Sequence, residues 1–567
     1  FGGLTAVVNG DMAKRIDFIP GGFSVAYGRA TGGVIHMHTR PGSERFHGYV
    51  DLDLIDVGIF LEGPLWKGAT FIISGRRSHL DAVLNLVLPE TRGFDLTVAP
   101  RYYDAQAKIN WRLSSRNMLE LMFYFSDDRL SFLRSTPIGR STIRGDFSFV
   151  TTFYRMNFRW LTREGKFLEH EMSLHGGFSL TGINAGGALG IDTDTTIISV
   201  RDELRLRFNK SIKMRAGLDL RVNRAVLKLK LPSNVPREGD QPGQNSGGDI
   251  LDDVTESRVN RWAAEPALYL EFDVNPIKSI RLQVGIRGDY NSVMNNFSFD
   301  PRGTVVWSPV KALELKASVG LFSQPPQGQE ISEDFGNPDL LHEKAIHYIV
   351  GGTYNWTKYF STRLTFYYKD LFDLISRSDK QIERNGEKVP ERYHNVGRGS
   401  SYGLEVMIRH QPHKRFFGWL SYTLGRSMRQ DKPEDDERFF QFDQTHILTV
   451  LGAYKLGYGF TISARFRLVS GNPTTPRIGS IYNADGANYI PLSGEVYSER
   501  NPLFNQLDIR LDYQLTFDTW KLLFYLDVQN VYNYPNQEGV QYNYDSSKSA
   551  PLTGVPVFPS IGIKGEF

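Results

Sequence analysis

The chain ends in the sequence Ser560-Ile-Gly-Ile-Lys-Gly-Glu-Phe567, which alternates without error and stops on an aromatic residue. Ile561 and Ile563 share one face of the extended chain, and Lys564 and Glu566 share the other. Successive side chains of a β-strand point to opposite faces, so this stretch predicts a strand with one apolar and one polar face. In a soluble sheet the apolar face would cover a protein core, whereas in a membrane barrel it would face lipid.

The same alternation recurs along the chain. It runs through residues 212–222, 460–468 and 507–515. Each stretch covers about nine to eleven residues, the length that crosses a bilayer at a tilt of about 45°. The intervening polar positions predict a charged lumen wall that includes Arg201, Glu203, Arg205, Arg215, Asp219, Arg221, Arg465, Arg467, Asp508, Arg510 and Asp512. Such a wall is too charged for a dry core, so we expect a wet lumen or a polar plug. Asp202 falls on the predicted lipid face, and we place it at a rim or a bulge.

The composition is compatible with a membrane barrel. No apolar run reaches the ~18 to 20 residues of a spanning helix, and the mean hydropathy is -0.34. A barrel escapes hydropathy scans because only every second residue meets lipid. Aromatic residues make up 13% of the chain, which suits interfacial girdles. The absence of cysteine excludes disulfides and thiol catalysis, and the net charge of +3 argues against a nucleic-acid-binding protein.

Short turns alternate with longer polar loops, which is typical of outer-membrane barrels. Counting the strands between these connections predicts a 22-stranded antiparallel transmembrane β-barrel in an all-β fold. The predicted strands are a hairpin over 46–61 and strands at 69–77, 102–113, 116–126, 147–161, 167–179, 191–207, 212–230, 257–274, 279–290, 297–307, 312–323, 342–354, 360–375, 393–410, 416–427, 439–455, 459–470, 500–515, 520–533 and 556–567. A barrel of this size has a lumen that needs a plug. We expect the short turns to face the periplasm and the long loops to face the outside.

The first 43 residues differ from the rest. Ile16 to Ile19 predicts a short strand, Pro20-Gly21-Gly22 a turn, and Val34 to Thr39 a second strand. The glycines between the two strands permit positive φ angles and close chain approach. This segment is therefore expected to form a compact β-turn-β unit ahead of the barrel.

The run from Arg15 to Gly28, continued by Gly32 to Ile35, resembles the end of the plug domain of TonB-dependent outer-membrane transporters. The residues that carry the resemblance are Pro20, Gly21, Gly22, Tyr27, Gly28, Arg29, Gly32 and Gly33. Gly336-Asn337-Pro338-Asp339-Leu340 is similar to the family's Asn-Pro-x-Leu motif, although Leu341-His342-Glu343 replaces the usual Lys-Pro-Glu. Residues 528–533 and the terminal Phe567, which in this family signals barrel assembly, also match.

The resemblance implies that residues 1–43 form the C-terminal part of a plug domain and residues 44–567 the barrel. It implies an active transporter and receptor of the bacterial outer membrane, without cofactor or enzymatic activity. Ligand would bind between the extracellular loops and the plug apex, and TonB would rearrange the plug. The expected partners are the lipid bilayer, lipopolysaccharide, the barrel-assembly machinery and TonB. The upstream plug half and the TonB box are not among these residues, so energy coupling is implied only for a longer parent chain.

Two other functions are compatible with parts of the pattern. The barrel could be a structural or secretion-associated subunit of a larger envelope assembly with further protein partners. A soluble carbohydrate-binding β-protein is disfavoured because the apolar strand faces would lack a partner layer. The substrate of a transporter stays open among iron chelates, cobalamin, oligosaccharides and peptides.

Several charged or metal-binding residue types have a structural interpretation as well as a functional one. His36 and His38 share a strand face and could bind a metal, but packing within the plug is favoured. The acidic runs Asp431 to Glu437 and Asp249 to Asp253 could bind Ca²⁺, but solvated loops are favoured. Arg15, Arg29 and Arg40 are predicted to dock the plug by pairing with lumen carboxylates such as Glu405, Asp508 or Asp512.

Overall fold

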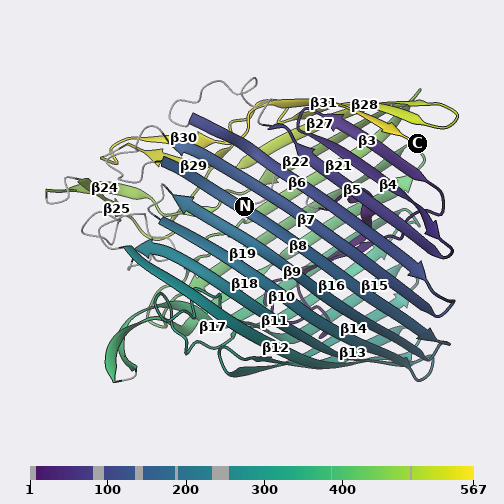
Figure 1. Ribbon diagram of the computed structural model, residues 1–567. Coiled ribbons are helices and arrows are strands. Elements are labelled where there is room, and N and C mark those ends of the chain that lie inside the picture. The colour runs from purple at the N-terminus through teal and green to yellow at the C-terminus, as the bar shows by residue number, and fades with distance from the viewer. Residues whose placement is uncertain are drawn as a thin grey trace.

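The computed structural model describes residues 8–80, 95–134, 145–185, 189–232, 254–384, 386–484, 488–543 and 545–567. These residues form a closed antiparallel barrel whose tilted strands surround a lumen (Figure 1). The prediction of 22 membrane-crossing strands is confirmed, with the two-residue β20 (Arg438–Phe439) adding a short extra pairing on β19. The wall consists of β3 (His47–Asp53), β4 (Asp56–Trp66), β5 (Ala69–Ser78), β6 (Asp95–Arg112), β7 (Asn117–Arg134), β8 (Gly145–Glu164), β9 (Leu168–Ala185), β10 (Leu189–Arg207), β11 (Ile212–Pro232), β12 (Val254–Ile277), β13 (Ile280–Asn291), β14 (Asn296–Val310), β15 (Leu313–Gln324), β16 (Glu343–Asn355), β17 (Phe360–Arg384), β18 (Glu387–His413), β19 (Phe416–Gln430), β21 (His446–Gly457), β22 (Phe460–Val469), β27 (Phe504–Thr516), β28 (Lys521–Gln529) and β31 (Phe558–Glu566).

The last strand closes the barrel. β31 pairs with β28 on one side and with β3 on the other. The Phe567 backbone N–H donates to the Gly48 carbonyl at 3.0 Å, and the Gly48 N–H donates to the Phe567 carbonyl at 3.2 Å. Closure leaves no unpaired strand edge in lipid, which is a requirement for a membrane-spanning sheet.

The alternation of the sequence matches the two faces of the wall. Leu511 and Ile561 lie on the outer face and are 38% and 63% exposed, whereas Glu203 on the inner face is 3% exposed. Asp202 lies on the outer face and forms a short ion pair with His170, whose ring packs edge-on against Trp160 at 5.8 Å between centroids. The register of β10 with both neighbours is unbroken there, so the alternative of a bulge at Asp202 is wrong.

Many strands continue into regions predicted as loops. β17 and β18 run for 25 and 27 residues, and β7, β8 and β9 also extend into the predicted loops at 127–146 and 180–190. In β17 the residues beyond the predicted end, Ser376 to Arg384, no longer alternate between apolar and polar, although the pairing with β18 continues. Other strands are shorter than predicted: β21 begins at His446 and not at residue 439, β27 begins at Phe504 and not at residue 500, and β28 ends at Gln529 and not at residue 533.

The short turns lie at one end of the barrel and the longer connections at the other, as Figure 1 shows. Three small two-stranded sheets lie in the loops at the long-loop end. They pair β23 (Pro473–Thr474) with β26 (Glu499–Arg500), β24 (Arg477–Asn483) with β25 (Asn488–Ser493), and β29 (Gln537–Tyr542) with β30 (Ser549–Thr553). In the described part of the chain, no helix is long and apolar enough to cross a membrane.

The predicted β-turn-β unit is present before the barrel. After the single-turn helix η1 (Gly10–Met12), β1 (Ala13–Ile19) pairs antiparallel with β2 (Val34–Thr39). We call residues 8–43 the N-terminal segment. Its contacts with inward-facing side chains of the wall place it inside the lumen, and they define the candidate site.

Candidate functional site

The N-terminal segment is attached to two separate parts of the lumen wall. Its middle, residues 20–33, contacts β11 to β17, which we call the β11–β17 arc. Its two ends contact β3 to β6 and β31. None of the hydrogen bonds or ion pairs that it makes within the described residues reaches β18 to β28, which we call the β18–β28 arc.

Cations of the β11–β17 arc bind backbone carbonyl groups of the segment. Arg302 donates from Nη1 to the carbonyls of Ser24 and Tyr27 at 3.0 and 2.6 Å. Lys369 donates from Nζ to the carbonyls of Pro20 and Gly32 at 2.7 and 2.8 Å. Two more wall residues act in the same way, Arg287 on Val25 and His347 on Thr31. Hydrogen bonds from charged donors are the stronger kind, so the arginine and lysine contacts hold the turn firmly. Apolar contacts lie beside them: Phe23 packs on Phe322 with ring centroids 4.5 Å apart, and Val25 and Ala26 pack with Tyr269.

Arg29 makes the reverse contact, from the segment to the wall. Its guanidinium lies 3.3 Å from an Asp219 carboxylate oxygen and 3.1 Å from one of Asp289, and it donates to the Glu265 carbonyl at 2.6 Å. The neighbouring Gly28 is required by close approach, since a Cβ built there would lie 2.0 Å from Arg287 Nε. The Arg287 guanidinium therefore lies against the backbone at Gly28, in the space that a side chain at position 28 would need.

The ends of the segment are bound to the opposite wall. Arg40 forms a bidentate pair with Glu62, which is buried, and Lys108 donates to Thr39 Oγ1 at 2.6 Å. Asn9 donates from Nδ2 to Tyr49 Oη at 2.9 Å, and Lys564 lies 3.6 Å from Asp11. The segment thus crosses the lumen from β3–β6 to the β11–β17 arc and back.

Arg29 and Arg40 do pair with lumen carboxylates, but the carboxylates named as examples from the sequence are wrong. Arg29 pairs with Asp219 and Asp289, and Arg40 pairs with Glu62. Arg15 stays within the segment, 2.8 Å from Asp17. The carboxylates named from the sequence, Glu405, Asp508 and Asp512, all lie on the β18–β28 arc. Charge alone could not choose among lumen carboxylates, because each side of the wall offers several.

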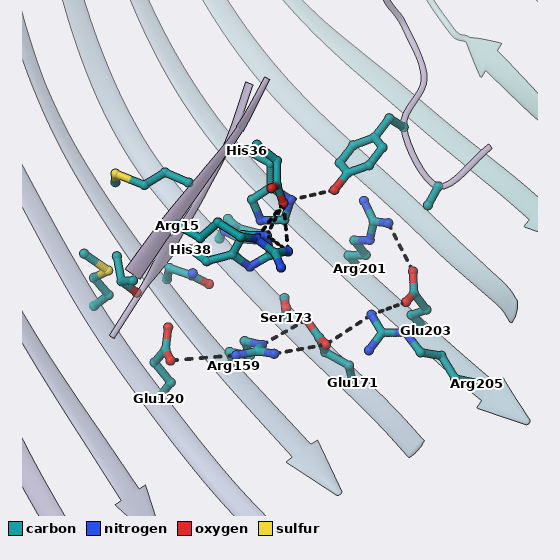
Figure 2. A pocket seen from close by; sticks show the side chains of 18 of the residues that line it. Arg15, His36, His38, Glu120, Arg159, Glu171, Ser173, Arg201, Glu203 and Arg205 are labelled. Atoms are coloured by element: carbon teal, nitrogen blue, oxygen red, sulfur yellow. Dashed lines mark hydrogen bonds and ion pairs between the residues drawn. The ribbon is translucent and has the colours of Figure 1, made fainter. Parts of the chain in front are cut away.

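A cavity of about 590 Å³ separates the β1–β2 hairpin from strands β7 to β11 (Figure 2). Its wall side contributes Glu120, Arg159, Glu171, Arg201, Glu203 and Arg205, and its segment side contributes Arg15, Tyr27, His36 and His38. These wall residues are near the strand ends that meet at short turns. By the expected orientation, the cavity lies toward the periplasmic side.

An ion ladder crosses the floor of this cavity. Arg159 lies 2.9 Å from Glu171 and 3.8 Å from Glu120, and Arg205 lies 3.4 Å from Glu171 and 2.5 Å from Glu203. The ladder continues with Arg201 to Glu203 (Figure 2). Arg215 then pairs with both Glu203 and Glu271. Opposite charges alternate from strand to strand, so the cavity presents a polar and nearly neutral surface.

His36 and His38 stack on one another, with ring centroids 4.2 Å apart. Tyr27 Oη lies 2.5 Å from His36 Nδ1, and His38 Nε2 lies 3.0 Å from Asp17. Burial lowers the pKa of His36, and the adjacent His38 lowers it further. Among the described residues, no group of three or more His, Cys, Asp or Glu side chains could hold a metal ion.

The remaining predicted residues lie in several places. Gly22 has a φ of +59°, and its N–H lies 3.4 Å from His347 Nδ1; Gly21 packs beside Ile349, and Gly33 beside the Ile19 carbonyl.

On the wall, Arg221 pairs with Glu265, Arg465 with Asp508 at 2.6 Å and Arg510 with Asp512 at 2.9 Å, while Arg467 stacks on Phe504. In the acidic loop, Asp431 pairs with Arg438 at 2.8 Å. Asp249, Asp252 and Asp253 lie outside the described residues.

The four side chains that donate to carbonyls of the turn, Arg287, Arg302, His347 and Lys369, were not identified from the sequence. Alternation could have placed them on the inner face. No pattern could have named their partners, because a carbonyl oxygen is present at every residue.

Curated relatives and solved structures agree on one kind of protein. The chain is 23% identical over 422 residues to the iron-regulated outer membrane virulence protein of Vibrio cholerae, covering 70% of this chain and 59% of the relative, so it spans less than two thirds of that protein's length. Its fold is similar to that of the outer membrane transporter YddB from Escherichia coli, with a TM-score of 0.71, 12% identity and coverage of 98% and 85% of the two chains. The FrpB iron transporter from Neisseria meningitidis gives a TM-score of 0.69 at 15% identity, with coverage of 99% and 88%.

The family model described as TonB dependent receptor-like, beta-barrel matches residues 72–531, from β5 to the end of β28. The closed barrel and the outer-membrane relatives agree with that match. The chain belongs to the TonB-dependent receptor β-barrel family of the bacterial outer membrane.

Proposed function

We propose that the protein is an active importer and receptor of the outer membrane, with residues 1–43 as the C-terminal part of its plug and residues 44–567 as its barrel. Ligand binds between the extracellular loops and the Arg29–Thr31 apex. TonB, acting on a preceding part of the protein, then rearranges the plug. The names of the relatives favour an iron chelate as the first ligand to test.

The polar attachment of the N-terminal segment carries this proposal. A gate must hold firmly at rest and still be able to move. Arg302 and Lys369 bind carbonyls through hydrogen bonds that water could replace once the turn shifts. The apolar contacts of the segment with the wall form small clusters, around Met12, around Phe23 and Phe322, and around Val25 and Ala26, so displacing the segment exposes a limited amount of hydrocarbon.

The cavity beside the β1–β2 hairpin supports the same proposal. It lies between the segment and the wall, and its ion ladder is completed by wall residues without help from the segment. Displacement of the hairpin would therefore leave the wall charges paired and widen a hydrated passage. The ladder would line this passage for a polar ligand.

A disulfide between the segment and the wall tests the gate. A Cβ built at Gly285 on β13 lies 2.9 Å from Val25 Cγ2 and 2.9 Å from the Leu270 carbonyl oxygen, so a Val25→Cys/Gly285→Cys pair is within bonding reach and requires a small shift of the wall. Residues 1–567 contain no cysteine, so within them the introduced pair is the only disulfide that can form. The control is Thr304→Cys/Ser318→Cys, which links two wall residues whose hydroxyl oxygens lie 2.9 Å apart.

Iron-starved cells expressing the full protein would be given radiolabelled ferric enterobactin and other ferric chelates. We expect oxidised Val25→Cys/Gly285→Cys to block uptake, reduction to restore it, and the control pair to transport in both states. Equal uptake by the locked and free forms would reject the segment as a gate. Stable co-purifying envelope proteins without chelate uptake would favour the structural or secretion role.

A further inference from the structure

The barrel wall has an incomplete pairing between β14 and β15. The two strands pair from Val310 and Leu313 as far as Arg302 and Gly320, yet β14 continues to Asn296 and β15 to Gln324. The pairing stops at Pro301, which has no N–H to donate to a neighbouring strand. The unpaired stretch lies at the long-loop end of both strands. We call it the β14–β15 seam.

Side chains close the seam where the backbone ladder is missing. Arg302 Nε donates to the Leu321 carbonyl at 3.2 Å. The Ser323 N–H donates to Asp300 Oδ2 at 3.2 Å, and Ser323 Oγ donates to Asp300 Oδ1 at 2.7 Å. Arg302 and Asp300 are themselves paired and buried. The inner side of the seam is therefore sealed by a polar group of three residues.

The outer side of the seam is hollow. A groove of about 760 Å³ runs over β12 to β17, and its sides are formed by Leu270, Val284, Ile286, Val319, Leu321 and Tyr348. Val284 and Val319 are 52% and 51% exposed, which places them on the lipid-facing surface. In the middle lie Pro301 and Gly303, and a Cβ built at Gly303 meets nothing within 4 Å. The groove is hollow because the central strand, β14, has Pro301 and Gly303 at positions where the neighbouring strands β13 and β15 have branched side chains such as Val284 and Val319.

We propose that this groove is a specific binding site for an acyl chain of a membrane lipid. The family and the outward apolar face place the groove in the bilayer, near the middle of strands β13 to β16. An acyl chain matches the lining, which offers hydrocarbon and almost no polar side chain. The bound chain covers a stretch of wall that backbone hydrogen bonds do not hold. This inference requires the barrel only and is independent of the proposed transport.

Filling the groove tests the proposal. Gly303→Trp places a large side chain in the groove, and Gly303→Leu fills part of it. The matched control is Gly176→Trp on β9, another lipid-facing glycine whose Cβ would meet nothing within 4 Å. The proteins would be reconstituted in vesicles of phosphatidylethanolamine and phosphatidylglycerol and released into mild detergent. Native mass spectrometry would then count retained lipids, and gel migration before and after heating would confirm that each variant is folded.

The wild-type protein and Gly176→Trp are expected to retain one more lipid than Gly303→Trp, with Gly303→Leu showing partial loss. Equal lipid counts in all four proteins would overturn the proposal. Loss of the lipid in Gly176→Trp as well would also overturn it, because the effect would then belong to any added bulk on the outer wall. If Gly303→Trp fails to fold, Gly303→Leu against the wild type decides the question by the same count.

Discussion

The two arcs of the lumen wall carry the same kind of residue and use it differently. In the β11–β17 arc, Arg287 and Arg302 have side chains that are 0% and 5% exposed, because the N-terminal segment covers them. In the β18–β28 arc, Arg465 and Arg510 are 47% and 36% exposed, and they form ion pairs with the wall residues Asp508 and Asp512. The first arc binds the N-terminal segment, whereas the ion pairs of the second arc, within the described residues, join parts of the wall and its loops. The strength of each ion pair should follow that difference, since buried pairs are costly to break and exposed ones are not.

Removing one arginine from each arc should separate them most strongly. Arg302→Met leaves the buried Asp300 without its ion partner and frees two carbonyls of the segment. We expect a loss of about 3 to 5 kcal/mol in the free energy of unfolding. Arg510→Met, which breaks a half-exposed pair with Asp512, should cost at most about 1 kcal/mol. Urea unfolding in lipid vesicles measures both, and equal losses would contradict the distinction between the arcs.

A second prediction separates the faces of one strand within the β18–β28 arc. Leu511 faces lipid on β27, and its neighbour Asp512 faces the lumen. Leu511→Arg should cost about 2 to 4 kcal/mol if the residue lies near the bilayer midplane. Asp512→Asn should cost much less, because the site stays polar. Heat-resistant migration of the folded barrel on gels compares them, and similar losses would refute the facing of β27.

A third prediction concerns the carbonyl contacts. Lys369→Met removes the donors to Pro20 and Gly32. We expect the docking of residues 20–33 to weaken by about 1.5 to 3 kcal/mol, the range for hydrogen bonds to charged groups. Lys521→Met, which breaks a wall pair with Glu566, is the control and should leave the segment unchanged. Hydrogen exchange of residues 20–33 reports the difference, and unchanged protection in Lys369→Met would show that this lysine does not hold the turn.

The smallest expected effect is a pH dependence of the β1–β2 hairpin. Burial and the adjacent His38 lower the pKa of His36 below 6.5; Arg201 acts in the same direction, and Asp17 and Glu171 oppose it. The His36 imidazole therefore binds a proton more readily in the unfolded hairpin than in the folded one. Protonation then favours the unfolded state, so the hairpin loses stability as the pH falls through about 6.5. Hydrogen exchange of β1 and β2, corrected for intrinsic rates, should accelerate between about pH 7.5 and about pH 5.5. His36→Gln should remove that acceleration, and its persistence in the variant would assign it to another group.

The fold could be predicted because the relevant information is local. Each wall strand must alternate to satisfy lipid and lumen, so residues such as Leu511 and Asp512 show their faces without knowledge of their neighbours. The strand ends were less predictable at the extracellular side, as in β17 and β18, where no lipid imposes an alternation. The glycines of the segment were also visible in the sequence. A glycine at position 28 indicates that another group lies close to the backbone there, but the sequence does not show that this group is the Arg287 side chain.

The sequence by itself determined a closed barrel of 22 strands, its two faces and a β-turn-β unit ahead of it, since a period of two is a property of the chain alone. Only the tertiary structure decided that Arg302 and Lys369 hold the turn, that Arg29 reaches Asp219 and Asp289, and that the pairing of β14 with β15 stops at Pro301. These contacts join residues hundreds of positions apart, often through carbonyl groups that every residue carries. Which of them meet depends on the curvature of the closed wall and the path of the segment across it.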